Sequence, residues 1–254
     1  MNCLRLLYLA FFISLIGCAP ADPQQNFSSS NTFAVPRISN QVVLGITDSW
    51  NSSHVTLQLF DRNGSQWQAS SQLWSGRLGK NGSSWGIGAH PKQGGKQKVE
   101  GDGRTPAGVF YIGGVWGYAE SCEKHPNTPY RQITSRDLWY ENKLSPYYNQ
   151  HKVLPYEPKS TAEKKAQMRQ GDAAHSLKMF VAHNPPPNAQ PGRGSAIFFH
   201  IWRGGGSKTT AGCTTMAESK LRSLISQINP DKTPTYVILP RQEYNRLKAE
   251  WQLP

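Results

Sequence analysis

The chain has 254 residues, of which 37% are hydrophobic, and this is enough to bury the core of one sizeable domain. It carries 28 Lys and Arg against 16 Asp and Glu, a net charge of +12, but the basic residues are scattered. Scattered charge argues against a nucleic-acid-binding protein and suits a polyanionic surface such as a cell envelope. Beyond the N-terminus no apolar stretch reaches the roughly 18 residues that a membrane-spanning helix needs, so we expect none there.

The N-terminus has the pattern of a secretion signal, in which Arg5 provides positive charge and Leu6–Ile16 an apolar segment. The segment ends in Leu15-Ile16-Gly17-Cys18, which resembles the bacterial lipobox. That resemblance implies cleavage before the cysteine and lipidation of the new terminal residue. The alternative is an ordinary signal peptide cleaved near Ala19 or Ala21.

We therefore expect residues 1–17 to be a lipoprotein signal peptide and Cys18 to carry the lipid anchor. The protein would lie in the bacterial cell envelope, on the periplasmic face, and on the outer membrane if the cell has one. Residues 18–40 are rich in Pro, Ser, Asn and Gln and have few large apolar side chains, which predicts a flexible tether. Residues 41–254 would then form the folded domain.

Strand-like patterns dominate this domain. Residues 41–47 form a strand-like apolar run, and residues 53–61 alternate apolar and polar side chains. Asn63-Gly64, between the second run and residues 66–74, predicts a hairpin turn. Further strands are expected at residues 108–114, 177–184, 195–202 and 235–240, and helices at Glu218–Ile228 and Arg241–Trp251. Residues 121–175 form a long irregular insertion. The pattern predicts a mostly β domain with a few helices (α+β).

The segment SAIFFHIW places His200 at the end of an apolar run. Strict alternation would put Ala196, Phe198, His200 and Trp202 on one face of a strand and Ile197, Phe199 and Ile201 on the other. A histidine in this position suits either a buried core residue or a catalytic base. The next residues include Gly204, Gly205 and Gly206, which permit close approach of a ligand and point to a substrate beside the loop.

Cys213 follows this glycine-rich loop. The spacing of Thr215 and Glu218 is that of a capping box, which predicts a helix beginning directly after the cysteine. A helix N-terminus and a nearby imidazole would lower the thiol pKa from about 8.5 into the neutral range. Gly212 would allow a tight turn that exposes the sulfur and directs backbone N–H groups at an oxyanion. These features point to a cysteine nucleophile with a histidine base.

Two separated motifs resemble the L,D-transpeptidases, the YkuD-type catalytic domain of bacterial cell-wall enzymes. HIW…TTAGCTTM is similar to their His…Ser/Thr-x-Gly-Cys-x-x-Met signature, and EGDGRTPAGVFYIG to their Gly-x-Thr-Pro-x-Gly-x-Phe segment. The matching positions are Thr210, Gly212, Cys213 and Met216 in the first motif and Gly103, Thr105, Pro106, Gly108 and Phe110 in the second. The likeness extends more weakly over residues 41–240, including SPYYN, toward a branch with the form Thr-Ala-Gly-Cys. It implies a β-sandwich catalytic domain.

The resemblance also implies a mechanism that needs no cofactor and no metal. Cys213 would attack the bond between the third and fourth residues of a peptidoglycan stem peptide, with His200 as base and then acid. The N–H groups of Gly212 and Cys213 would form the oxyanion hole, and Thr210 would support the loop. An amine would resolve the acyl-enzyme into a cross-link, as in an L,D-transpeptidase; water would make the protein an L,D-carboxypeptidase.

The chain departs from the pattern of many relatives, which have His or Arg before the Gly-Cys pair and Arg two residues after it. Here these positions hold Ala211 and Thr215, so the familiar cation is missing. Arg203 or Lys208, with Gly205 between them, would take over the binding of a substrate carboxylate.

Three other interpretations remain open. A disulfide between Cys122 and Cys213 would block the nucleophile, although Cys122 lies in no motif and a free thiol is favoured. A metal site of His183, His200 and Cys213 lacks any closely spaced ligand pair. A non-catalytic wall-binding lipoprotein would use tryptophans as a glycan-stacking surface, although in a β domain they are more often core residues. The candidates for that surface are Trp50, Trp67, Trp74, Trp85, Trp116 and Trp139.

Overall fold

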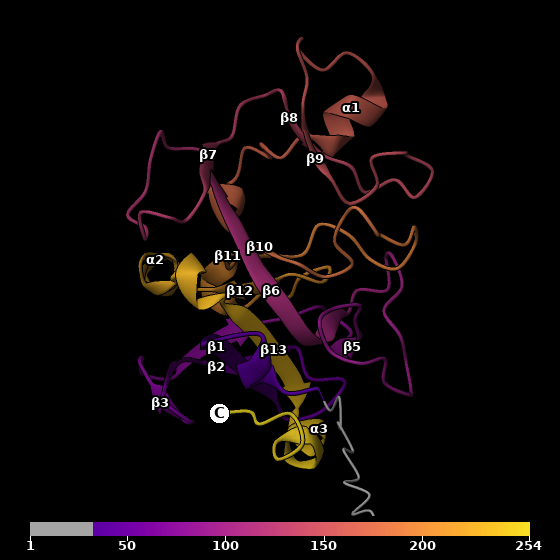
Figure 1. Ribbon diagram of the computed structural model, residues 1–254. Helices are drawn as coiled ribbons and strands as arrows, with labels where there is room; N and C mark the ends of the chain where they lie inside the picture. Colours follow the sequence, from indigo (N-terminus) through magenta and orange to yellow (C-terminus); the bar gives the residue numbers. More distant parts are fainter. Residues whose placement is uncertain (1–32) are drawn as a thin grey trace, which may run out of the picture. The chain divides into compact units, whose positions relative to one another are not determined.

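The computed structural model describes residues 33–254 (Figure 1). The expected signal peptide, the lipidated Cys18 and residues 19–32 lie outside the described residues. The strands are β1 Gln41–Thr47, β2 His54–Asn63, β3 Gln66–Ala69, β4 Trp74–Arg77, β5 Ser83–Trp85, β6 Thr105–Gly117, β7 Tyr130–Gln132, β8 Asp137–Trp139, β9 His151–Val153, β10 Leu177–Val181, β11 Phe198–Ile201, β12 Thr214–Met216 and β13 Thr235–Pro240. The α-helices are α1 Thr161–Ala166, α2 Glu218–Gln227 and α3 Arg241–Leu247, and short 3-10 helices include η2 Ala173–His175 and η3 Gly204–Gly206.

The main sheet closes on itself. Its strands follow the order β1-β13-β6-β10-β11-β12-β4-β2, and β2 pairs again with β1, which completes a barrel-like ring. β3 extends the sheet from β2, while β5 and β7 pair with β6. The predicted mostly β fold with a few helices is therefore confirmed. Its sheet is barrel-like, with β1 and β2 joining its two ends.

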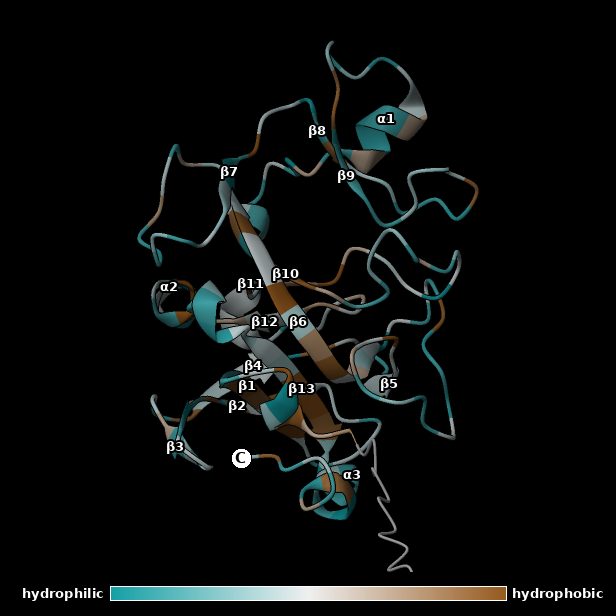
Figure 2. Ribbon diagram, in the orientation of Figure 1, coloured by the Kyte–Doolittle hydropathy of each residue, from teal (hydrophilic) through white to brown (hydrophobic). Residues whose placement is uncertain are grey.

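Alternation along the strands divides the core between the two faces of the sheet. Val43 on β1 and Tyr236 on β13 belong to the large cluster that also receives the apolar face of α2. Their neighbours Val42 and Val237 lie on the opposite face, in a second cluster under α3. Both strands are thus buried on both faces, which explains their nearly continuous apolar sequence and the brown colour of β13 in Figure 2.

The start of α2 differs from the prediction. Residues 214–216 form the short strand β12, which pairs in parallel with β11, and α2 begins only at Glu218. Its N-cap is Ala217, which has no side-chain oxygen, so no capping box forms. Sheet pairing with β11 prevails over the local capping signal. The helix N-terminus therefore does not lie directly after Cys213. The predicted second helix also ends earlier, at Leu247.

The folded domain begins earlier than expected. Val35, assigned to the tether from the sequence, is fully buried, and its N–H donates to the carbonyl of Trp251 at 2.9 Å. Phe33 packs edge-on against the Trp251 ring at 5.2 Å between centroids. Residues 33–40 are therefore part of the domain. Within residues 33–254 no helix has the length and apolarity needed to cross a membrane.

The insertion at residues 121–175 covers one face of the β10–β11 region. It contains β7, the two-stranded sheet of β8 and β9, α1 and η2. Ile133, Trp139 and Met168 from the insertion bury Phe198 of β11 in a third apolar cluster, which Cys213 also joins. In Figure 1, β8, β9 and α1 lie beyond one end of the long strand β6, and α3 lies near the other end. The insertion thus forms one wall around the face that carries His200.

Candidate active site

The two motifs found in the sequence meet in space at Gly212. A methyl group on Gly212 would lie 3.1 Å from the carbonyl oxygen of Arg104 and 3.2 Å from Cδ1 of Ile197. The neighbouring Thr105 hydroxyl accepts the N–H of Gly79 at 2.9 Å, and the next residue, Lys80, donates its N–H to the carbonyl of Thr210 at 2.9 Å. Gly212 thus allows close approach of the two segments, and its φ lies outside the left-handed region, so the tight turn that we expected does not explain this glycine.

Thr210 braces the loop that carries the cysteine, as the resemblance implied. Its hydroxyl donates to the carbonyl oxygen of Cys213 at 2.7 Å and accepts the N–H of Gly212 at 3.1 Å. One prediction changes in consequence. The Gly212 N–H is engaged by Thr210 and is not available to an oxyanion, which leaves the N–H of Cys213 as the donor from the predicted pair.

Cys213 and His200 share one face of the β11–β12 pair. Phe199, Ile201 and Ile197 face the main core, whereas Phe198 and Ala196 face the insertion, as the alternation predicted. His200 follows Phe198 by two residues on β11 and therefore points the same way. Cys213 lies one residue before β12, at the register position opposite Phe198. The parallel pairing of two short strands thus places the thiol and the imidazole on the same face of the sheet.

The thiol of Cys213 is in its neutral form at rest. Its Sγ donates to the carbonyl oxygen of Ala196 at 3.4 Å, and burial raises the pKa of the thiol to about 11. The predicted lowering of the pKa at a helix N-terminus is wrong, because β12 separates Cys213 from α2. Formation of the thiolate therefore depends on a base and on charged groups around the site.

His200 is buried, with 3% of its surface exposed, and burial lowers its pKa to about 4. Its Nδ1 lies 2.9 Å from the carbonyl oxygen of Ile201. Because a carbonyl only accepts hydrogen bonds, Nδ1 carries the hydrogen, and Nε2 is the nitrogen of the neutral ring that can accept a proton. The ring stacks on His175 at 4.6 Å between centroids and an angle of 26°. His200 is thus a neutral, oriented imidazole able to accept a proton.

A cavity of about 360 Å³ brings the predicted catalytic residues together. Its lining includes Cys213, His200, Gly212, Thr210 and, of the predicted substrate-binding residues, Arg203. The Arg203 guanidinium is tied to Asp172 at 2.6 Å, which fixes its place at the cavity wall.

Two predicted substrate-binding residues lie apart from the cavity. Lys208 and Gly205 are exposed on the loop around η3 and do not line it. The cavity wall also contains two carboxylates that the sequence did not single out, Glu100 and Glu141.

The structure adds His175 and Lys178 to the site. His175 belongs to η2 in the insertion, and burial together with His200 and Lys178 lowers its pKa to about 3. Lys178 is the register partner of His200 on β10 and is 3% exposed. The only sequence signal was a lysine inside the apolar run LKMFV.

The disulfide and metal interpretations do not match the described geometry. Cys122 and Cys213 are both free thiols, and they pack in different apolar clusters. His183 lies apart from the cavity, where its Nδ1 accepts the N–H of Ile87 at 3.2 Å and its Nε2 lies 2.9 Å from the carbonyl of Arg193. Backbone groups therefore occupy both ring nitrogens. Within residues 33–254 no group of three or more His, Cys, Asp or Glu is arranged to hold a metal ion.

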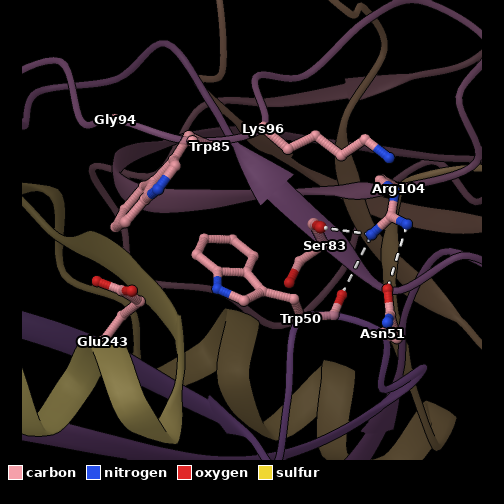
Figure 3. Close-up of a pocket in the computed structure, with 9 residues that line it drawn as sticks. Trp50, Asn51, Ser83, Trp85, Gly94, Lys96, Arg104 and Glu243 are labelled. Atoms are coloured by element: carbon pink, nitrogen blue, oxygen red, sulfur yellow. Dashed lines mark hydrogen bonds between the residues drawn. The ribbon is translucent and has the colours of Figure 1, made fainter.

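The tryptophans serve mainly as packing residues. Trp74, Trp85 and Trp139 are buried, and Trp50, Trp67 and Trp116 pack half-buried against the clusters. Figure 3 shows Trp50 and Trp85 at a hollow of about 270 Å³, where the Arg104 guanidinium donates to the carbonyls of Ser83 and Trp50 and to Oδ1 of Asn51. Arg104 thereby anchors the segment whose carbonyl contacts Gly212.

Comparison with solved structures finds matches of low similarity. Bd1075 of Bdellovibrio bacteriovorus is 15% identical, with a TM-score of 0.39, over 85% of this chain and 55% of its own. The helical cell shape determining protein Pgp2 of Campylobacter jejuni is 13% identical, with a TM-score of 0.37, over 80% of this chain and 51% of its own. The chain thus spans about half the length of these structures. No curated protein matches the sequence.

A family match covers most of the site. Residues 51–237 match YkuD, the L,D-transpeptidase catalytic domain, and this range includes both motifs, the insertion, and the Cys213 and His200 positions. The chain therefore belongs to the YkuD family of L,D-transpeptidase catalytic domains.

Proposed function

We propose that this protein is a peptidoglycan L,D-transpeptidase that acts on stem peptides through an acyl-enzyme on Cys213. The observation that carries the proposal is the cavity that Cys213, His200 and Arg203 line together. A thiol, an oriented neutral imidazole and a fixed guanidinium supply the nucleophile, the base and a partner for a substrate carboxylate. The YkuD match supports the same class of enzyme.

In the first step, the Cys213 Sγ–H bond breaks and the proton moves to Nε2 of His200. The thiolate attacks the carbonyl carbon between the third and fourth residues of the stem. The N–H of Cys213 stabilises the resulting oxyanion. Collapse of the intermediate breaks the C–N bond, and the imidazolium of His200 returns its proton to the departing amine of the terminal D-residue. The product is a thioester on Cys213.

In the second step, the amine of another stem peptide attacks the thioester carbonyl carbon, and His200 takes up the amine proton. The C–S bond then breaks, and His200 returns the proton to the Cys213 sulfur. Glu100 and Glu141 lie in the cavity wall, where carboxylates attract an incoming ammonium group. The insertion covers the same face of the sheet and limits access of water. These features favour an amine acceptor over water, and hence cross-linking over simple trimming of the stem.

The protein would act in the bacterial envelope, held to a membrane by lipid on Cys18. This part of the proposal rests on the lipobox-like Leu15–Cys18 sequence and on the preceding apolar segment. The net charge of +12 suits an anionic envelope surface. A role in cell-wall biogenesis and cell shape follows from action on stem peptides.

Incubation of purified protein with disaccharide-tetrapeptide, followed by mass analysis, tests the function. We expect cross-linked dimers and free terminal D-residue, and neither with Cys213→Ala. Tripeptide monomers alone, even at high substrate concentration, would identify an L,D-carboxypeptidase instead. Intact substrate with both proteins, together with retention on purified wall material, would identify a wall-binding lipoprotein.

A further inference from the structure

Lys178 is a buried cation without a carboxylate partner. Within residues 33–254 its Nζ forms no ion pair; it donates to the carbonyl of Met168 at 3.1 Å and lies 3.3 Å from Nδ1 of His175. Both are neutral acceptors, since burial keeps His175 unprotonated at neutral pH. Burying a charge without a counter-charge is costly, and evolution retains such groups chiefly at functional sites.

The location of Lys178 relates it to the catalytic pair. β10 pairs Lys178 with His200 of β11, and β11 pairs His200 with Thr215 of β12, so the three residues form one row across the sheet. The Nζ also lies over the Phe198 ring, 5.6 Å from its centroid, and Cys213 packs in the same cluster as Phe198. Thr215 brings no charge to this row. Lys178 is therefore the cation on the side of His200 opposite Thr215.

We propose that Lys178 is a positioning residue whose ammonium group is the counter-charge of the Cys213 thiolate. The inference rests on the proposed function, which is the reason that a reactive thiolate is needed. The expected effect of Lys178 on the Cys213 thiol does not depend on that function. Burial disfavours the charged thiolate, and a cation near the nucleophile offsets this cost. Lys178 does not line the cavity, so it acts through Cys213 and His200 rather than on substrate.

The proton balance is simple. The thiol loses its proton to Nε2 of His200, which leaves thiolate, imidazolium and ammonium close together. The ammonium stabilises the thiolate and repels the imidazolium, so His200 holds its proton weakly and passes it on to the departing amine. The other ionisable groups around Lys178 are His175, Asp172, Glu141 and Arg203. Asp172 is already paired with Arg203, which leaves the thiolate as the new partner for Lys178.

The charge of Lys178 is present at neutral pH. Burial lowers the pKa of its ammonium group to about 8, and the thiolate form of Cys213 and the carboxylates of Asp172 and Glu141 oppose that shift. Above this pH the free lysine loses its charge, and its support for the thiolate weakens. An arginine at the same position would stay charged.

A purely structural role would be to tie the insertion to β10 through the bond to Met168. The two roles predict different outcomes for Lys178→Met, which has a similar length and no charge. Loss of a structural tie lowers stability and leaves the thiol unchanged. Loss of a counter-charge lowers thiol reactivity, whereas stability stays equal or rises because a buried charge is removed.

The test measures alkylation of Cys213 by iodoacetamide from pH 6 to 10 in a Cys122→Ala background, so that only one folded-domain thiol reacts. Urea unfolding is measured in parallel. We expect Lys178→Met and Lys178→Gln to react about tenfold more slowly at pH 7, with the profile moved to higher pH. Lys178→Arg should restore most of the rate. The matched control is Lys152→Met, since that lysine lies over the Tyr147 ring on the insertion.

Unchanged alkylation profiles in both neutral variants, with the protein folded, would overturn the proposal. Equal slowing in Lys178→Arg would also overturn it, because the charge would then not be the active feature. Alkylation requires no peptidoglycan, so this outcome is independent of whether the protein cross-links stem peptides.

Discussion

The hydroxyl of Thr210 donates a hydrogen bond of 2.7 Å to the carbonyl oxygen of Cys213 and accepts one of 3.1 Å from the N–H of Gly212. One side chain thus binds the backbone on both sides of the nucleophile, at the Gly212 N–H and at the Cys213 carbonyl. The backbone of Thr210 is itself fixed, because its N–H donates to the carbonyl of Leu78 at 2.9 Å. The position of the cysteine therefore depends on a short polar network rather than on a helix.

Thr210→Val removes both bonds and keeps the size of the side chain. We expect acylation of Cys213 by a carbapenem-type reagent to slow by roughly tenfold, since each lost bond is worth about 1 kcal/mol and the loop loosens. Intact-mass kinetics measure the rate. Thr210→Ser should restore it, and Thr209→Val, at an exposed neighbour, should have no effect. Equal rates for Thr210→Val and wild type would show that the loop does not need the brace.

Cys213 should be the only essential thiol. Incubation with the same reagent should give one adduct by intact mass in wild type and in Cys122→Ala, and none in Cys213→Ala. The reason is geometric, because Cys213 lines the cavity with His200, whereas Cys122 packs against the main core. An adduct that survives in Cys213→Ala would contradict the assignment.

Asn149 should be essential for the attachment of the insertion to the site. It is fully buried, its Nδ2 donates to the carbonyls of His183 and Asn184, and its Oδ1 accepts from Trp139 Nε1 and from the N–H of Ala196. Asn149→Ala leaves these buried groups without partners. We expect a loss of at least about 3 kcal/mol in the free energy of unfolding, measured in urea. Asn188→Ala, at an exposed position, is the control. Each buried group left without a partner costs about 1–3 kcal/mol, so a loss in the free energy of unfolding below about 1 kcal/mol would refute this role.

Stability should fall as the pH is lowered below about 6.5. Burial lowers the pKa of His90 and His200 to about 4 and that of His175 and His183 to about 3. Between these values and 6.5 the unfolded chain binds more protons, so the stabilisation is complete above 6.5 and is lost as pH falls toward the folded-state values.

Urea unfolding at pH 7.5, 6 and 5 measures this effect. Each buried histidine can lower the free energy of unfolding by at most about 1.4 kcal/mol per pH unit. His90 lies outside the cavity that Cys213 and His200 line, and its Nδ1 accepts the N–H of Val109 at 3.0 Å. His90→Gln should therefore reduce the slope, whereas His54→Gln, at an exposed residue, should not. A stability that does not change from pH 7.5 to 5 would contradict the buried, neutral histidines.

Lipidation at Cys18 is tested in cells. Cys18→Ser should move the protein from the membrane fraction to the soluble fraction of the envelope, because the anchor is lost while the domain from residue 33 onward is untouched. Mass spectrometry of the wild-type N-terminal peptide should show the lipid. Membrane retention of the variant, together with an unmodified wild-type peptide, would remove the lipoprotein proposal.

Local patterns were sufficient to predict much of the scaffold. Nearly continuous apolar runs placed β1 and β13 at their observed bounds, and helical spacing located α2 to within one residue at its C-terminal end. The alternation in SAIFFHIW also assigned Phe198 and Phe199 to opposite faces. These features depend on which side chains are buried, and the order of apolar and polar residues along the chain indicates this directly. The resemblance to the L,D-transpeptidase motifs, rather than periodicity, made Cys213, His200 and Thr210 the candidate site residues.

Tertiary structure alone decided the chemical environment of the site. Pairing of β12 with β11 overrode the capping signal at Thr215, so the pKa of Cys213 is set by burial rather than by a helix N-terminus. Lys178 and His175 come next to His200 only because β10 and the insertion pack there. Such contacts join residues far apart in the chain, and no local periodicity encodes them. The sequence thus determined which residues stand at the candidate site, whereas the closure of the sheet determined their charges and neighbours.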